Sequence, residues 1–207
     1  MKRAVTVYAE MTPNPNTIKF VSDVMLMNGG ETADFLTPEE AKGCSSMASA
    51  LFNFPFVKSM FFASNFVTIT KTDSIEWSMI TNDLRDFVLS WLEENEKVVE
   101  VLPSAREVET SGGVGNGKKT VSEKAELNTE ADKQIFNLLE EYVRPAVESD
   151  GGAIDFQNFD PVTGVVTVVL RGACSGCPSS TATLKGGIES LLKANMPDVR
   201  EVVALEG

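Results

Sequence analysis

The stretch between Pro103 and Leu127 constrains the fold most, because it divides a chain of 207 residues into two segments. The apolar periodicity of helices and strands is absent there, and residues 111–119 read SGGVGNGKK, which is the composition of a flexible linker. Each flanking segment is long enough to bury one small core. We therefore expect two domains, at residues 1–102 and 128–207, joined by a Gly-rich linker over residues 103–127.

The first segment is predicted to form a ββαββα domain. Strands are expected at residues 4–9 and 17–22 and in a hairpin at 57–62 and 66–71 that turns at 63–65. A helix should begin at Thr37, where a cap, a proline and a Glu follow one another, and should run to about Phe52. A second helix, long and amphipathic, should begin at residue 73 or 74.

The second segment is predicted to form an αββαβ domain, which makes the fold class α+β with two small domains. A helix capped by Asn128 or Thr129 should have its last turn kinked or tightened by Pro145. A hairpin of residues 154–156 and 165–170 follows, then a helix from Pro178 and a strand at 199–205. A strand, helix, strand passage favours a parallel crossover.

The composition limits the class of partner. The formal net charge is -12, which argues against binding to nucleic acid or to an anionic membrane surface. No apolar run is long enough to span a bilayer, and the chain begins with strand-like alternation instead of an apolar signal region. Three cysteines make no disulfide framework, so we expect a reducing compartment. Our expectation is a cytoplasmic protein of a bacterium, or an organelle matrix protein whose transit peptide has been removed.

The motif Cys174-Ser175-Gly176-Cys177-Pro178 carries the expected chemistry. The chain has no histidine, so these two thiols are the prominent soft ligands. Pro178 marks a helix start, whose polarity favours the thiolate form that binds metals. Structural zinc sites and iron–sulfur clusters are usually bound by four protein ligands, so groups other than these two thiols must supply the remaining ligands. The spacing by itself leaves both a metal site and a redox dithiol open.

Other conspicuous residues are expected to have structural roles. Cys44 has no partner at ligand spacing, and the loop from Met11 to Thr17 is expected to be a plain connection. Gly112 to Gly117 follow no strand and do not form a phosphate loop. Core packing is expected for two sets of side chains, the methionines Met25, Met27, Met47, Met60 and Met79 and the aromatic residues Phe52, Phe54, Phe56, Phe61, Phe62 and Phe66.

Two sets of residues resemble a known family. Residues 172–181, which read GACSGCPSST, and residues 184–189 resemble the signature of the NifU C-terminal domain family, as do Arg144-Pro145 and residues 149–152 upstream. Residues 12–20 and 57–62 resemble the N-terminal domain of Nfu-type proteins. The resemblance covers nearly everything except the linker.

The resemblance implies a scaffold or carrier that is not an enzyme. Such a protein receives a nascent iron–sulfur cluster from an upstream donor, usually [4Fe–4S] and otherwise [2Fe–2S], and delivers it to apo-protein clients. The cluster cysteines of the family correspond to Cys174 and Cys177. Because one chain offers two ligands, a homodimer should share the cluster.

Two alternatives remain at this point. The pair could be a dithiol that exchanges with disulfides, although the predicted order of elements is not thioredoxin-like. It could also be half of a structural zinc site that bridges two chains through four thiolates.

Overall fold

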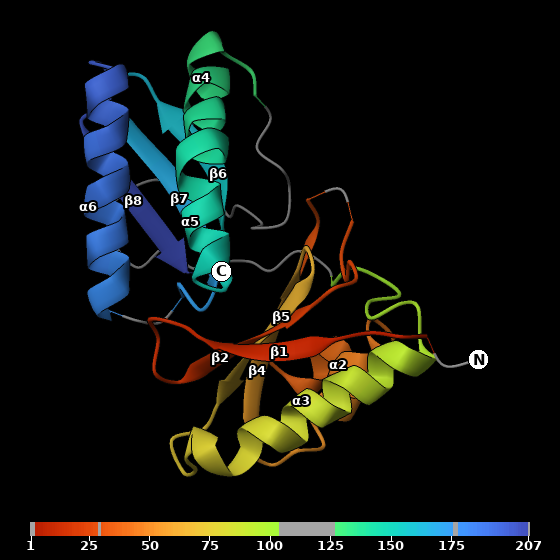
Figure 1. Cartoon of the computed structure of the whole chain (residues 1–207). Helices are drawn as coiled ribbons and strands as arrows, with labels where there is room; N and C mark the ends of the chain where they lie inside the picture. The colour runs from red at the N-terminus through yellow and green to blue at the C-terminus, as the bar shows by residue number, and fades with distance from the viewer. Residues whose placement is uncertain (1–2, 29, 104–126, 176–177, 207) are drawn as a thin grey trace.

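The computed structural model describes residues 3–28, 30–103, 127–175 and 178–206, with the backbone alone for residues 178–181 (Figure 1). It has mixed α and β content and two separate hydrophobic cores, one on each side of the predicted linker, so the coarse fold class is confirmed. Except for its end residues, the expected linker at 103–127 lies outside the described residues.

The N-terminal domain contains a five-stranded sheet in which all neighbouring strands are antiparallel. Its strand order is β1-β2-β5-β4-β3. The strands are β1 (Val7–Met11), β2 (Thr17–Ser22), β3 (Thr32–Phe35), β4 (Val57–Ala63) and β5 (Phe66–Lys71).

The predicted order ββαββα is wrong because it lacks β3. This strand has only four residues, and Ala33 and Asp34 in its centre are of types depleted in strands, so its local signal is weak. It is a strand because it pairs with β4, from Thr32 opposite Ala63 to Phe35 opposite Met60. The first strand also begins later than expected, at Val7, where its pairing with Ser22 of β2 begins.

The helix expected from Thr37 to Phe52 is two short helices, α1 (Pro38–Ala41) and α2 (Ser46–Leu51). Thr37 caps α1 as predicted, and its side chain accepts from the Glu40 amide. Gly43 has a φ of +76°, which ends the helical path. Ser45 then caps α2 by accepting from the Ala48 amide at 2.9 Å. The sequence interpretation overlooked this second cap.

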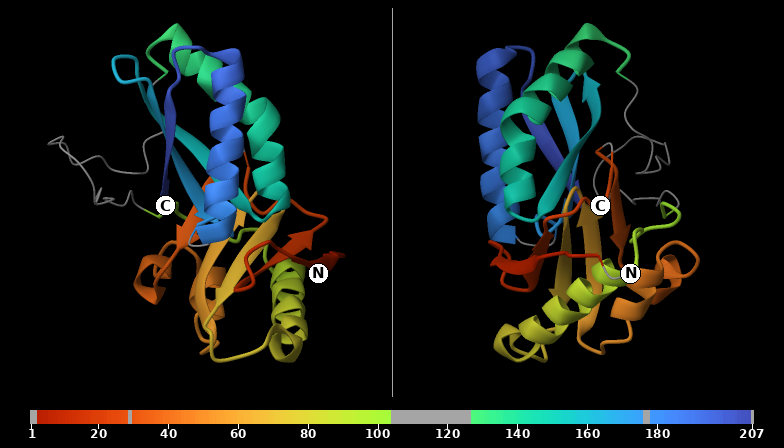
Figure 2. Two further views of the ribbon diagram at one scale, coloured as in Figure 1. Left: turned by 90° about the vertical axis from the view of Figure 1, so that its left-hand side faces the viewer. Right: turned by 45° about the vertical axis from the view of Figure 1, so that its right-hand side comes forward.

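The helix α3 (Trp77–Glu94) covers one face of the N-terminal sheet (Figure 2). It begins later than residue 74 because Glu76 is the N-cap. Alternate residues of the strands point toward α3 and α2, and side chains of these two helices pack on them. We call this side of the sheet the inner face. Fully buried members of this core are Phe20, Met47, Leu51, Phe62, Val67, Ile69, Leu84 and Val88.

The C-terminal domain begins with a continuous helical stretch and continues with a three-stranded sheet of order β6-β7-β8. The β6–β7 pair is antiparallel and the β7–β8 pair is parallel. The helices lie on one face of this sheet (Figures 1 and 2). The elements are α4 (Glu130–Leu138), η1 (Leu139–Val143), α5 (Arg144–Ser149), β6 (Gly152–Asp160), β7 (Val165–Gly172), α6 (Pro178–Asn195) and β8 (Glu201–Glu206).

The first helical stretch has a capping box at its start and a π-helical turn before Pro145. Thr129 Oγ1 accepts from the Asp132 amide at 3.0 Å, and the Asp132 carboxylate accepts from the Thr129 amide at 2.9 Å. Pro145 has no amide hydrogen to donate, and η1 immediately precedes α5, in which Pro145 lies. The effect on the helix is therefore a widened turn at η1, where the sequence had suggested a kinked or tightened last turn.

Glu189 joins α6 to β8. Its carboxylate accepts from the Val202 amide at 3.1 Å and pairs with Lys193 Nζ at 2.5 Å. The Lys193 hydrogen bond, followed by that from Val202, lowers the pKa of the Glu189 carboxyl. A lowered folded-state pKa gives stability that is present above the ordinary carboxyl pKa and is lost as pH falls.

The second face of the N-terminal sheet, which we call the outer face, is also buried. Antiparallel sheets commonly leave one face to water, yet all six residues of β2 are buried. Outer-face residues Val21, Phe61, Ala63 and Phe66 form a buried cluster with Ala153 of β6. The C-terminal domain therefore packs against this face, on the side of the sheet opposite α3 (Figures 1 and 2).

This packing changes the interpretation of several apolar residues. Phe61 and Phe66 lie between the domains, while Phe62 belongs to the N-terminal core and Phe52, Phe54 and Phe56 pack half-buried against it. Among the methionines, Met27, Met47 and Met60 are in that core as expected. Core packing is wrong for the two others, since Met25 is 56% exposed and Met79 is 71% exposed.

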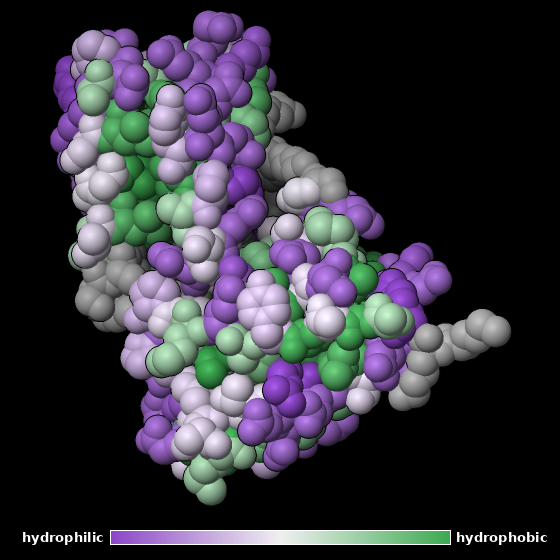
Figure 3. Space-filling view, viewed as in Figure 1, coloured by the Kyte–Doolittle hydropathy of each residue, from purple (hydrophilic) through white to green (hydrophobic). Residues whose placement is uncertain are grey.

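The surface view shows apolar side chains gathered between α6 and the α4–α5 stretch, with hydrophilic side chains around them (Figure 3). Half-buried residues Leu138, Leu184 and Leu191 pack against the C-terminal core. Within the described residues, no helix combines the length and the apolar character needed to cross a bilayer.

Replacing the cap residue Thr129 by Ala should destabilise the C-terminal domain. The change removes the acceptor of the Asp132 amide, and loss of such a cap typically costs about 1 kcal/mol. Urea denaturation followed by circular dichroism would measure the free energy of unfolding. Lys133→Ala is the control, because that side chain is 55% exposed and should change stability by less than about 0.5 kcal/mol. Equal stability of both variants would contradict the role of the cap.

Candidate functional site

Cys174 lies in the loop that connects the end of β7 to the start of α6. The residue is 6% exposed and belongs to the core of the C-terminal domain. Pro178 is the first residue of α6, as the sequence predicted. Cys177 and Gly176 lie outside the described residues, so their place in the predicted site stays a prediction.

The loop around Cys174 begins with a tight turn. Gly172 has a φ of +64°, a conformation that glycine adopts without strain. The Ser175 amide donates to the Gly172 carbonyl at 3.1 Å, and the Ala173 amide donates to the Gly151 carbonyl at 3.1 Å. The cysteine loop is therefore held against the turn that follows α5.

Gly152 explains how the sulfur is accommodated. A Cβ atom on Gly152 would lie 2.5 Å from the Arg171 carbonyl oxygen and 2.8 Å from Cys174 Sγ. The missing side chain leaves the room that the thiol occupies. Gly152 therefore passes close to the thiol itself.

Charged residues beside this turn form ion pairs. Arg144 donates to the Ile154 carbonyl at 3.0 Å and to Glu140 Oε1 at 2.7 Å. Arg171 Nε donates to Asp155 Oδ2 at 2.8 Å, and Arg171 Nη1 lies 3.4 Å from Asp34 Oδ2 in the N-terminal domain. The Arg171 guanidinium therefore joins β7 both to β6 and to β3 of the N-terminal domain.

The loop from Met11 to Thr17 could be a plain connection or a docking surface for a partner, and the plain connection that we favoured is wrong for one of its residues. Asn14 is 7% exposed, and its Nδ2 donates to the carbonyl oxygen of Ala173 at 3.3 Å. The N-terminal domain therefore contacts the residue next to Cys174. Pro13 and Pro15 on either side of Asn14 are the sequence signal for a rigid loop that presents this amide.

Cys44 contacts other parts of the N-terminal domain and not the cysteine loop. It is half-buried against the N-terminal core, and its carbonyl accepts from the amides of Glu100 at 2.8 Å and Val101 at 3.0 Å. These contacts fit the structural role expected for it. Among the described residues, no three side chains of His, Cys, Asp or Glu gather closely enough to hold a metal ion.

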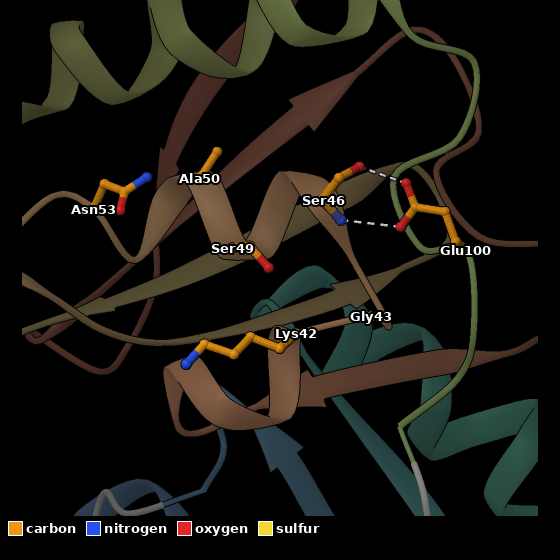
Figure 4. Close-up of a pocket in the computed structure, with 7 residues that line it drawn as sticks. All are labelled: Lys42, Gly43, Ser46, Ser49, Ala50, Asn53 and Glu100. Atoms are coloured by element: carbon orange, nitrogen blue, oxygen red, sulfur yellow. Dashed lines mark hydrogen bonds between the residues drawn. The ribbon is translucent and has the colours of Figure 1, made fainter.

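A separate hollow lies beside α1 and α2, with a volume of about 740 Å³ (Figure 4). The one carboxylate that lines this hollow belongs to Glu100. One of its oxygens accepts from the Ser46 amide at 2.9 Å, and the other accepts from the Ser46 hydroxyl at 2.5 Å. No thiol lines it. The cysteine loop is therefore the better candidate for metal chemistry.

Comparison with known proteins assigns both halves of the chain to known domain families. Residues 7–96 match the family described as "Scaffold protein Nfu/NifU N terminal", and residues 135–203 match the "NifU-like domain". The mitochondrial NifU-like protein of Saccharomyces cerevisiae is 35% identical over 214 residues, which cover 99% of this chain and 82% of that protein. The chain belongs to the NifU-like (Nfu) family.

Other relatives of this Nfu-type chain are longer. The mitochondrial NifU-like protein 4 of Arabidopsis thaliana is 33% identical over 201 residues, covering 97% of this chain and 66% of that protein. The mitochondrial NFU1 iron-sulfur cluster scaffold homolog of Drosophila willistoni is 34% identical, covering 97% of this chain and 64% of that protein. The chain thus spans about two thirds of the length of these two relatives. A solution structure of a yeast NifU-like protein aligns at a TM-score of 0.43 with 25% identity, covering 46% of this chain and 85% of that one.

The Gly152→Ala variant should displace the cysteine loop of this Nfu-type chain. The added Cβ meets the Arg171 backbone, which cannot move cheaply, so we expect a loss of about 1 to 3 kcal/mol from overpacking. Thermal unfolding would measure it. The matched control is Gly187→Ala in α6, where a Cβ meets nothing within 4 Å and should add about 0.5 to 1 kcal/mol. If Gly152→Ala were as stable as Gly187→Ala, the close fit of Gly152 against Arg171 and Cys174 would be wrong.

Proposed function

We propose that this chain is a scaffold or carrier for iron–sulfur clusters and not an enzyme. The observation that carries the proposal is the family membership of both domains, with a relative named as an iron–sulfur cluster scaffold that aligns over 97% of this chain. The cluster is cargo, and the thiolates of Cys174 and Cys177 are its ligands from this chain. Thiolates are the usual ligands of such clusters.

The proposed site is completed by a second chain. A cluster ligated by four thiolates needs two more donors than this motif provides, and the described residues hold no group of three metal-ligating side chains. A homodimer in which each protomer contributes Cys174 and Cys177 supplies them at a symmetric interface. We favour [4Fe–4S] as the cargo, with [2Fe–2S] as the alternative.

Delivery follows from the small number of ligands on each chain. Client apo-proteins carry thiols of their own, which can replace the scaffold thiolates one at a time by associative exchange. An upstream donor loads the cluster by the reverse process. The names of the relatives place them in mitochondria, so we propose an organelle matrix as the compartment of this chain, and nothing supports the bacterial cytoplasm expected from composition.

Anaerobic reconstitution with iron and sulfide tests the function. The whole chain should turn brown, become dimeric on size exclusion, and hold one cluster per two chains. Cys174→Ala and Cys177→Ala should each abolish the colour and the dimer, because each removes two of the four ligands from a symmetric site.

Cys44→Ala is the matched control and should change neither property, because Cys44 packs against the N-terminal core. A colourless protein that cycles between dithiol and disulfide would refute the carrier function in favour of the redox alternative. A colourless dimer that holds one zinc ion per two chains would refute it in favour of a structural clip.

A further inference from the structure

The outer face of the N-terminal sheet makes polar contacts to the C-terminal domain at positions that flank Cys174. Three side chains of the N-terminal domain donate to backbone carbonyls there. Thr68 Oγ1 donates to Gly151 at 2.6 Å, Asn14 Nδ2 donates to Ala173 at 3.3 Å, and Lys19 Nζ donates to Ser149 at 3.3 Å. We call these three hydrogen bonds the clamp.

All three donors of the clamp are buried, at 1% exposure for Thr68, 7% for Asn14 and 8% for Lys19. Buried polar groups cost free energy unless they are paired, and Thr68 and Asn14 donate to carbonyls of the C-terminal domain, which favours the docked arrangement. Lys19 Nζ also pairs with Glu10 Oε2 of its own domain, at 3.2 Å. The apolar cluster of Val21, Phe61, Ala63 and Phe66 with Ala153 lies on the same face and adds hydrophobic contact.

The glycines of the C-terminal domain fit this contact closely. Gly151 has a φ of +82°, and a Cβ on it would lie 2.9 Å from Thr68 Oγ1. A Cβ on Gly172 would lie 2.7 Å from the Phe61 ring. Both glycines therefore allow the N-terminal domain to approach the turns on either side of the cysteine loop.

The clamp is linked to the sulfur through the backbone. The Gly151 carbonyl accepts both from Thr68 and from the Ala173 amide, and the Ala173 carbonyl accepts from Asn14. Ala173 is thus fixed at both its amide and its carbonyl. The next residue, Cys174, is held with its side chain in the C-terminal core, at 6% exposure.

We propose that the docked N-terminal domain is a regulator of the cysteine loop, and that the clamp holds Cys174 in a withdrawn state. This inference rests on the proposed function for its purpose, because a cluster shared by two chains requires the sulfur to leave the core. Loading therefore requires the clamp to open. A second chain with its cluster, which binds only the open state, shifts the equilibrium toward it.

The test measures thiol exposure in the apo-protein, without iron. The whole chain carrying Cys44→Ala is reduced and treated with iodoacetamide, and modification of Cys174 is followed by peptide mass spectrometry. Asn14→Ala combined with Thr68→Val removes two hydrogen bonds of the clamp and nearly preserves shape at Thr68. We expect Cys174 to react roughly 5- to 30-fold faster, which is the factor for a loss of one to two kcal/mol in closure.

The matched control is Thr81→Val in α3 combined with Asn95→Ala at the C-cap of α3. Both side chains donate to carbonyls of their own helix, Thr81 to Trp77 and Asn95 to Trp91, on the side of the sheet away from the clamp. This control should react at the wild-type rate. Thr68→Ser, which retains the hydroxyl, should stay within about twofold of wild type if the hydrogen bond to Gly151 is the cause.

Equal Cys174 rates in the clamp and control variants would overturn the proposal. If the double variant loses its circular dichroism signal, Lys19→Met replaces it as the test. Lys19→Met keeps the apolar stem and removes the donor to Ser149, so Cys174 should also react faster, by a smaller factor. An unchanged rate in folded Lys19→Met would then overturn it. Because this readout needs no cluster, a wild-type chain that fails to bind iron and sulfide would refute the proposed function and leave the clamp result intact.

Discussion

The carbonyl oxygen of Gly151 is the acceptor on which the arrangement of the two domains depends. It receives the Thr68 hydroxyl from the N-terminal sheet and the Ala173 amide from the cysteine loop. One atom therefore connects the outer face of one domain to the candidate ligand of the other. A side chain at Gly151 would require strained left-handed backbone and would meet Thr68, so glycine satisfies both the conformation and the close approach.

Around this acceptor, the structure buries polar groups that would otherwise face water. Lys19 and Thr68 lie in β2 and β5 and Asn14 lies in the loop before β2, and in an isolated N-terminal domain their polar groups would face water beside the apolar side chains of Phe61 and Phe66. Their burial against glycine turns makes the contact selective, because each donor must find its carbonyl when the domains dock. The same selectivity lets a small change in docking free energy alter the exposure of Cys174, which gives a carrier a means of controlling when its thiols are available.

Much of the local structure could be predicted from the sequence. The hairpin of β4 and β5, the start of α6 at Pro178 and the cap at Thr37 depend on neighbouring residues, and each lies where the pattern placed it. The cap of α4 is Thr129, one of the two residues expected, and its capping box with Asp132 was not predicted. The strand β3 and the break at Gly43 were missed. A four-residue strand containing Asp34 exists only through its pairing with β4, and no local pattern reports a distant partner.

The sequence by itself determined the two-domain α+β composition, the family and the position of Cys174 before a helix start, because these follow from periodicity, caps and a short motif. Only the tertiary structure decided that Phe61 and Phe66 lie between the domains and that Asn14 contacts Ala173. The reason is physical: alternation along a strand shows that a residue points to one face of a sheet, but only the packing of another domain determines whether that face is buried and which distant backbone atoms its side chains reach.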